Sequence, residues 1–478
     1  MALTSAINSA LSGLTASTRL AQTTSDNLAN AQTQGYGRRE LNLVPDLLGG
    51  VRVDSLSRDV NLAAIGDRRL ADADVGREQY GAAVLSRLEQ TFGPVGSDGG
   101  VAGRLDALEE SLIFAGGEPS SEVRLRGVLN RLDDLVAAIR SDADALKAQR
   151  EEADRAIARD IETLNQSLQQ IEELNADIGR IRNSGQDPSP LIDQRQVVVD
   201  QIASITPVRQ VDRGDDVIAL YSMSGESLID GPAPEFTFEA TPTIMPAMSF
   251  AGGVLNGVFK NGNPLSLNDG FGRLKGGSLE ANFELRDQTV PDIQANLDNI
   301  AADLVRRFED TTVDPSLTAG DPGLLTDGGA ALDPLDITGL SFRLAVNVGV
   351  DPDQGGDLSN FRDGVNAVAA GPVGNAEQLD RWLSALRDTT TVVAGGANQS
   401  AASHAADYIA DVGERRVYAE QNLSFAQARQ DRLLSAELAN GVDSDQELQN
   451  LLRIEQAYAA NVRVIQTIDQ MMRQLMEI

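Results

Sequence analysis

Residues 451–478 read LLRIEQAYAANVRVIQTIDQMMRQLMEI, and their apolar spacing predicts one long helix with a single apolar seam. No Gly or Pro interrupts the chain from residue 442 to the end, so we expect a helix of roughly 45 Å. The seam residues follow a 3-4-3-4 spacing, which places them at the a and d positions of a heptad repeat. They are Leu451, Ile454, Tyr458, Asn461, Ile465, Ile468, Met472 and Leu475. Such a helix must pack either against its own domain or against a neighbouring chain.

The first thirty residues carry a second seam in the same heptad phase, and they also lack proline. The seam consists of Leu3, Ile7, Ala10, Leu14, Ser17, Ala21, Thr24 and Leu28, of which only four are large. Burial of four large side chains contributes about 6–12 kcal/mol, whereas fixing thirty residues of backbone costs on the order of 30–60 kcal/mol. Hydrogen bonds reduce the difference between this cost and the gain from burial. Packing against one partner helix does not offset the remainder. We therefore predict that both termini are loosely ordered in the free monomer and become ordered among several neighbouring chains.

The composition excludes several classes of partner and site. The chain of 478 residues has 40 Lys and Arg against 71 Asp and Glu, a net charge of −31. Nucleic acids and anionic membranes both require a basic face, so we expect neither as a partner. The chain contains no cysteine, and no apolar run approaches the length of about 18 residues that a membrane span needs. The first residues lack the pattern of a cleavable secretory signal, which predicts a cytosolic protein or export by a route that reads no such signal.

Between the two terminal helices the sequence changes character in a nested order. Helical spacing in 61–92, 101–114, 119–182, 191–205, 276–310, 378–387 and 402–440 predicts long antiparallel helices of a bundle. Residues 208–275 are richer in Pro, Gly, Thr and Phe, with the alternation typical of strands. The predicted fold is therefore mainly α with an inserted β domain, and the nesting predicts the chain ends at one pole and the insert at the other. Pro291 predicts a kink or restart, and residues 341–348 predict a strand.

This nesting predicts three discontinuous domains. The first is a terminal coiled-coil assembly domain, 1–58 and 441–478, in which 37–58 form an extended connector. The second is a helical bundle domain, 59–207, 276–310 and 362–440. The third is a small β-rich outer domain, 208–275, which could also include 311–361.

No pattern of residues in the chain predicts catalysis. The glycines of 96–103 have no preceding strand and no following Lys-Ser/Thr, so they indicate a flexible link and not a phosphate loop. Asp215 and Asp216 fit a solvated turn better than an acid–base pair, and we interpret His404, the only histidine, as a surface residue. Trp382 is most simply the core anchor of its helix. We expect no catalytic residue, no cofactor and no metal ion.

Residues 27–39 read NLANAQTQGYGRR, which resembles the motif that ends the first helix of bacterial flagellar rod, hook and hook-associated proteins. The matching positions are Leu28, Ala29, Asn30, Thr33, Gly35 and Tyr36. The chain departs from that motif at Gln34, where the family has Pro, and at Gly37, where the family has Ser. The last helix is similar to the closing helix of the same proteins, with Asn450, Leu451, Leu452, Gln456, Ala457, Tyr458, Ala460, Asn461, Val464 and Ile465 in the matching positions.

The middle of the chain resembles the FlgK family of hook-associated proteins in particular. The similarity lies in the long helices, in the sequence LIDQR at 191–195, in GGSL at 276–279, and in Arg286, Asp287 and Pro291. The resemblance implies an extracellular flagellar protein of the hook–filament junction, exported through the type III apparatus without a cleavable signal. The implied partners are further copies of the chain, the hook protein, the next hook-associated protein, and an export chaperone on the C-terminal helix.

The resulting hypothesis is a non-catalytic adaptor whose terminal helices pack with those of neighbouring subunits. Assembly would bury Leu451, Ile454, Tyr458, Ile465, Ile468, Met472 and Leu475 against Leu3, Ile7, Leu14 and Leu28, and the polar Asn461 would fix the register. Three alternatives remain open at this point: a flagellar hook or rod protein, a cytosolic coiled-coil scaffold, and an extracytoplasmic enzyme that uses Asp215 and Asp216.

Overall fold

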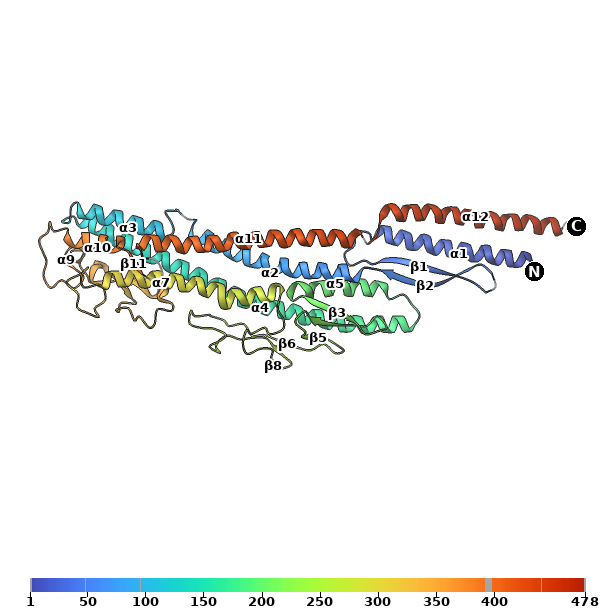
Figure 1. The fold of residues 1–478 in the computed structure, drawn as a ribbon, viewed down its shortest axis with the longest axis horizontal. Coiled ribbons are helices and arrows are strands. Elements are labelled where there is room, and N and C mark those ends of the chain that lie inside the picture. Colours follow the sequence, from blue (N-terminus) through green and yellow to red (C-terminus); the bar gives the residue numbers. More distant parts are fainter. Residues whose placement is uncertain (1, 48, 95, 392–397, 440, 477–478) are drawn as a thin grey trace.

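The computed structural model describes residues 2–47, 49–94, 96–391, 398–439 and 441–476, and shows an elongated molecule built on long helices (Figure 1). Its longest element, α4 (Glu122–Asn183), has 62 residues and a length of about 93 Å. Apolar residues recur along α4 at helical spacing, and the side that they form is buried throughout. Five of the other seven main helices of the body contact this helix directly.

The helical body consists of seven helices around α4 and two apolar cores. The helices are α2 (Leu62–Phe92), α3 (Val101–Gly116), α5 (Ser189–Ile205), α6 (Gly277–Glu284), α7 (Val290–Glu309), α10 (Glu377–Arg387) and α11 (Ala401–Ala439). One core joins the first half of α4, up to Ala153, to α2, α3, α7, α10 and α11. The other joins the second half of α4, from Ile157, to α5, α6 and the neighbouring strands. Neither core contains a residue of the two terminal helices.

The chain passes from α6 to α7 through one π-helical turn, Leu285–Thr289. Pro291 follows this turn, and its missing N–H removes one bond of the regular helical ladder. A π turn absorbs such a break without ending the helix. The predicted irregularity at Pro291 is therefore a change in hydrogen-bond register.

The strands in the described part of the chain form five small sheets, two of which lie in the inserted segment. One is β3 (Val208–Asp212), β4 (Ile218–Ser222) and β5 (Ser227–Ile229), all antiparallel. The second is β6 (Phe236–Thr237), β7 (Phe259–Lys260) and β8 (Asn263–Pro264). Two further pairs are β9 (Leu325–Asp327) with β10 (Leu344–Val346) and β11 (Thr390–Thr391) with β12 (Asn398–Gln399).

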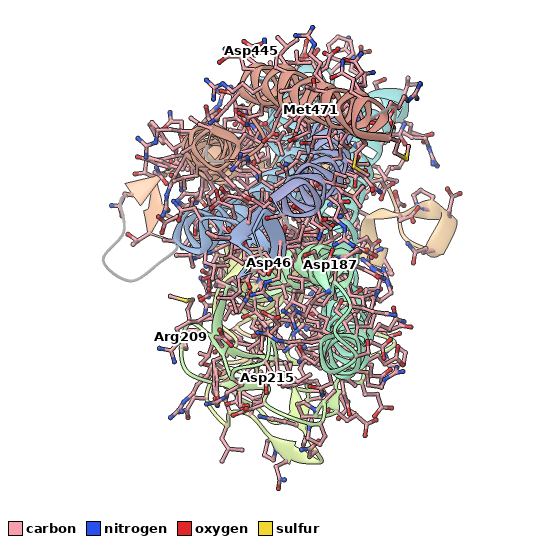
Figure 2. All side chains as sticks on the ribbon, turned by 90° about the vertical axis from the view of Figure 1, so that its right-hand side faces the viewer. Asp46, Asp187, Arg209, Asp215, Asp445 and Met471 are labelled. Carbon is pink, nitrogen blue, oxygen red and sulfur yellow. The ribbon has the colours of Figure 1, made fainter. Side chains whose placement is uncertain are left out.

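The prediction that the insert lies at the pole opposite the chain ends is wrong. The strands of 208–264 lie along the flank of the body, and the far pole is built from α3, α10 and α9 (Asn360–Asp363) (Figure 1). The physical reason is the length of α4, which carries the chain back toward its termini before the insert begins. Viewed from the end that bears the termini, Asp445 and Met471 of α12 lie on one side of the molecule, and Arg209 and Asp215 of the insert lie on the other (Figure 2).

The strand predicted at 341–348 is only partly correct, because the structure has a helical turn, α8 (Leu340–Arg343), before β10. The carboxylate of Asp298 accepts hydrogen bonds from the backbone N–H of Gly339 at 2.7 Å and of Ser341 at 3.0 Å. These bonds hold the chain in a turn where the local sequence favours an extended strand.

Two single residues illustrate what the sequence could and could not show. Trp382 is fully buried, as predicted, and its indole N–H donates to the carbonyl of Phe361 at 3.1 Å. His404 is not a surface residue: its side chain is 9% exposed, and Nδ1 lies 3.1 Å from Oδ2 of Asp303. No helix in the described part of the chain combines the length and the apolar character that crossing a membrane requires.

Candidate assembly interface

Four elements form what we call the terminal unit: α1 (Ala2–Ala29), β1 (Arg38–Pro45), β2 (Val51–Asp59) and α12 (Ser444–Met476). The two helices lie side by side at one end of the molecule, and β1 and β2 form an antiparallel hairpin beside them (Figure 1). The hairpin has a bulge between Asn42 and Leu43. The two ends of the chain thus form a single structural unit, on which both predicted seams lie.

The predicted seam residues are unevenly buried within one chain. On α1, Ala10, Ser17 and Thr24 are buried, whereas Ile7, Leu14, Ala21 and Leu28 are half-buried. On α12, Ile468 is buried, Leu451, Ile454, Asn461 and Ile465 are half-buried, and Tyr458 and Met472 are exposed. The side chains of Leu3 and Leu475 lie outside the described part of the structure. A single chain therefore leaves much of the α12 seam accessible, and the role of these residues in assembly stays a prediction.

A close approach of the two helices occurs at Gly13 and Asn461. A β-carbon at Gly13 would lie 2.7 Å from Nδ2 of Asn461, so the absence of a side chain makes room for the amide. A polar residue at a seam position of this kind favours one register over its neighbours. The space left by Gly13 therefore accommodates Asn461, the polar seam residue identified in the sequence.

The small residues of α1 also receive the tip of the hairpin. Val51 N–H donates to Oγ of Ser12 at 3.2 Å, and a β-carbon on Gly50 would clash with the same hydroxyl. Gly50 has a φ of +93°, which a glycine adopts without strain. Serines on this side of α1 therefore let the hairpin lie directly on the helix.

Exposed apolar side chains occur along the whole length of α12, including two seam positions, Tyr458 and Met472. Leu448, Leu452, Tyr458, Val464, Met471, Met472 and Met476 are all more than one third exposed. A concentration of exposed apolar side chains on one element indicates an interaction site on a soluble protein. Within the described part of the chain, these side chains remain accessible to solvent.

The turn that joins α1 to β1 is organised by Asn27, which is buried. Its Oδ1 accepts from the hydroxyl of Tyr36 at 2.8 Å and from the N–H of Arg39 at 2.9 Å, and its Nδ2 donates to the carbonyl of Arg39 at 2.9 Å. Burial raises the pKa of Tyr36, so the phenol remains a proton donor to Asn27. Heptad spacing does not predict this role of Asn27, and its place beside seam position Leu28 is the signal that the sequence offers.

The remaining motif residues shape the same turn. Ala29 is the exposed last residue of α1, and the side chain of Thr33 donates to Oδ1 of Asn30 at 3.2 Å. Gly35 has a φ of +77°, and a β-carbon there would lie 2.7 Å from Cγ2 of Val197 on α5. Only glycine fits this backbone conformation and this close approach together.

The motif at 27–39 meets the LIDQR sequence of 191–195 at Asp193 on α5. Its Oδ1 accepts from the N–H of Gly37 at 3.0 Å and from Nε of Arg58 at 2.7 Å. Arg195, two residues along, is buried and donates to the carbonyl of Asp216 at 2.6 Å in the β3–β4 turn. Burial lowers the pKa of Arg195 to about 10. Helix α5 therefore connects the terminal unit on one side to the inserted strands on the other.

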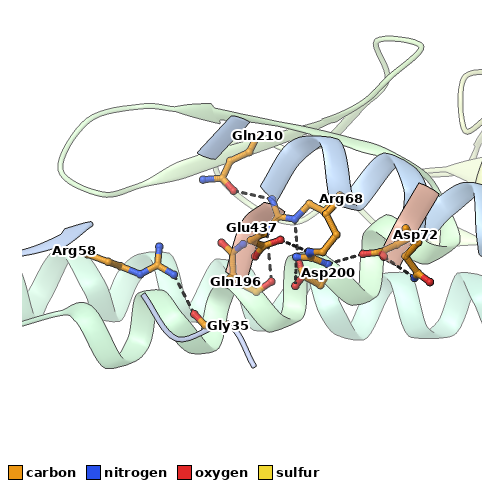
Figure 3. Close-up of polar contacts among 10 residues, drawn as sticks. Gly35, Arg58, Arg68, Asp72, Gln196, Asp200, Gln210 and Glu437 are labelled. Atoms are coloured by element: carbon orange, nitrogen blue, oxygen red, sulfur yellow. Dashed lines mark hydrogen bonds and ion pairs between the residues drawn. The ribbon is translucent and has the colours of Figure 1, made fainter. Parts of the chain in front are cut away.

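Further ion pairs join the end of α11 to the body, and join β1 to α12 within the terminal unit. Arg68 on α2 pairs with Asp200 at 2.7 Å and with Glu437 at 2.5 Å (Figure 3). Arg38, at the start of β1, pairs with the buried Glu447 on α12 at 2.8 Å. These contacts fix where α11 ends and where α12 begins.

Two regions of the chain match models of known protein families. The model of the flagellar hook-associated protein FlgK helical domain matches residues 85–323, half of the chain. The model of the C-terminal region of the flagellar basal body rod FlgEFG proteins matches residues 439–478. The chain is also similar to flagellar hook-associated protein 1 of Bacillus subtilis, with 22% identity over 98% of this chain and 96% of the relative.

A solved structure, the flagellar hook junction protein FlgK from Burkholderia pseudomallei, is similar with a TM-score of 0.45 and 16% identity. The match covers 55% of this chain and about half, 47%, of that protein. The two matching models place the chain among the structural proteins of the flagellar rod, hook and hook-associated classes. Within them, the chain belongs to the FlgK family of flagellar hook-associated proteins.

Proposed function

We propose that the protein is a structural junction between the flagellar hook and the filament, and that it assembles through its terminal unit. Neighbouring copies would pack their α1 and α12 helices into a continuous helical layer. The observation that carries this proposal is the set of exposed apolar side chains on α12, which lie outside both cores of the helical body. Burial of apolar area is the main driving force for association of this kind.

The energetics of a single chain support the same proposal. Besides small residues, Ile468 is the only seam side chain in the described part of α1 and α12 that is fully buried. Each additional large side chain buried between copies contributes about 1.5–3 kcal/mol. Assembly would therefore supply the stabilisation that the isolated pair of helices lacks.

The proposal includes the partners that the family implies. The hook protein would contact the assembly on one side and the next hook-associated protein on the other. Export would proceed through the flagellar type III apparatus, with a chaperone bound to α12 until secretion. The chaperone would thereby cover the exposed apolar side chains of α12 that later contact other subunits.

Deletion of residues 442–478 is expected to abolish assembly and leave a folded, soluble remainder. The remainder keeps both cores of the helical body, so its circular dichroism should keep the helical signal of that body. Light scattering and electron microscopy at concentrations where the full chain assembles provide the measurement. A remainder that still forms the same assemblies would contradict the proposal.

A point variant separates assembly from the loss of a whole helix. Leu452→Lys places a charge at an exposed apolar position of α12 and should reduce assembly strongly. Leu267→Lys, at a still more exposed position on the β-rich flank, is the control and should assemble as the unmodified chain does.

A further inference from the structure

An open cleft of about 610 Å³ lies at the elbow where α11 and α2 meet the terminal unit. Its apolar wall consists of Val60, Leu434, Leu438 and Val442. Leu434 and Leu438 are 41% and 59% exposed, although they border a hollow in which an apolar group could cover them. Filling such a site removes apolar surface from water on both partners.

The charged residues around the cleft are already paired with one another or with neighbours. Arg38 pairs with Glu447, Arg58 with Asp193, and Arg68 with both Asp200 and Glu437. A charged guest would therefore have to break an existing ion pair or give up its own hydration. The cleft favours an apolar guest.

The tip of the β1–β2 hairpin carries an apolar side chain of suitable shape. Leu47 is fully exposed, and the bond from Val51 to Ser12 holds the tip on α1. A hairpin tip is narrower than a helix, whose diameter with side chains is about 10–12 Å, so it can enter a cleft that the side of a helix cannot. The eight residues of β1 span about 27 Å between the tip and the cleft. Leu47 therefore cannot reach the cleft of its own chain.

We propose that Leu47 of one copy enters the elbow cleft of the next copy and packs against Leu434 and Leu438. This proposal rests on the proposed function, because it requires the terminal units of successive copies to lie next to each other. The contact joins two different surfaces, so it is heterologous and extends into an open series instead of closing as a dimer. The contact of Leu47 with the cleft thereby sets the axial offset between copies, and the helix seams supply the buried surface area.

Site-specific crosslinking tests this contact directly, because the chain has no native cysteine. Full-length Leu47→Cys and Leu438→Cys chains are mixed under assembly conditions and treated with a short bis-maleimide. The expected result is a crosslinked heterodimer in several-fold higher yield than from Leu47→Cys mixed with Tyr418→Cys. Tyr418 is the matched control because it lies on the same helix as Leu438 and has the same exposed fraction, 59%.

A third variant, Leu452→Cys, places a thiol at an exposed position of α12 and reports whether the terminal units assemble at all. Equal yields from the two mixed pairs, together with crosslinks through Leu452→Cys, would overturn the contact of Leu47 with the cleft and leave the proposed function intact. An absence of crosslinks between copies at every position would overturn both.

Discussion

Replacing Arg286 by methionine is expected to destabilise the helical body by about 3–5 kcal/mol, the usual effect of removing one partner of a buried ion pair. Arg286 and Asp154 are both fully buried, and Nη1 of the arginine lies 2.6 Å from Oδ1 of the aspartate. Arg286 also binds Asp287 through Nε at 2.9 Å and Nη2 at 2.8 Å. The variant would leave Asp154 charged and unpaired in the interior. The midpoint of urea unfolding measures the effect.

Two further variants show whether the buried charge is the cause. Arg155→Met removes an arginine from an exposed pair with Glu152 on the same helix as Asp154, and should cost no more than about 1 kcal/mol. Arg286→Met combined with Asp154→Leu removes both charges and should recover much of the loss. Similar costs for Arg286→Met and Arg155→Met would contradict this account of the pair.

Replacing Asp142 by asparagine is expected to raise the free energy of unfolding at pH 8 by about 2–4 kcal/mol. Asp142 on α4 is buried, and its Oδ2 has no hydrogen-bond partner among the described residues. Burial raises the pKa of Asp142 to about 7, whereas the pKa of an unfolded aspartate is about 3.9. The folded protein therefore holds a proton that the unfolded chain has lost between these two pH values.

The sign of the pH dependence follows from this difference. Because the folded state binds more protons, the contribution of Asp142 to stability falls as the pH rises from about 4 to about 7 and then stays constant. Asp142→Asn should remove this part of the pH dependence, as measured by urea unfolding at several pH values. Asp144→Asn, at an exposed position on the same helix, should leave it unchanged. An unaltered pH profile in Asp142→Asn would show that this carboxyl keeps an ordinary pKa.

The long helices could be predicted from the sequence because their packing is periodic. The apolar spacing of α4 and α12 is regular over many turns, and few other structures fit such a pattern. The place of the insert and the turn at 339–343 could not be predicted, because they depend on contacts between residues far apart in the chain. Asp298 and Ser341 are one example, and Asp303 and His404 are another.

The candidate interface was predictable in part for the same reason. Heptad spacing identified the two seams, and the motif resemblance identified the turn at Gly35 and Tyr36. Spacing did not show that Asn27 bonds both Tyr36 and Arg39, nor that Asp193 binds Gly37, because hydrogen bonds across a fold leave no period in the sequence. The elbow cleft is likewise visible only where α2, α11 and the motif turn meet in space.

The central claim is that α1 and α12 become stably ordered only when several copies pack together. Amide hydrogen exchange of residues 2–29 and 444–476, compared between the dilute monomer and the assembled protein, tests it most directly. The account predicts rapid exchange of both helices in the monomer and strong protection after assembly, while α4 stays protected in both states. Equal, strong protection of α1 and α12 in the monomer would contradict it.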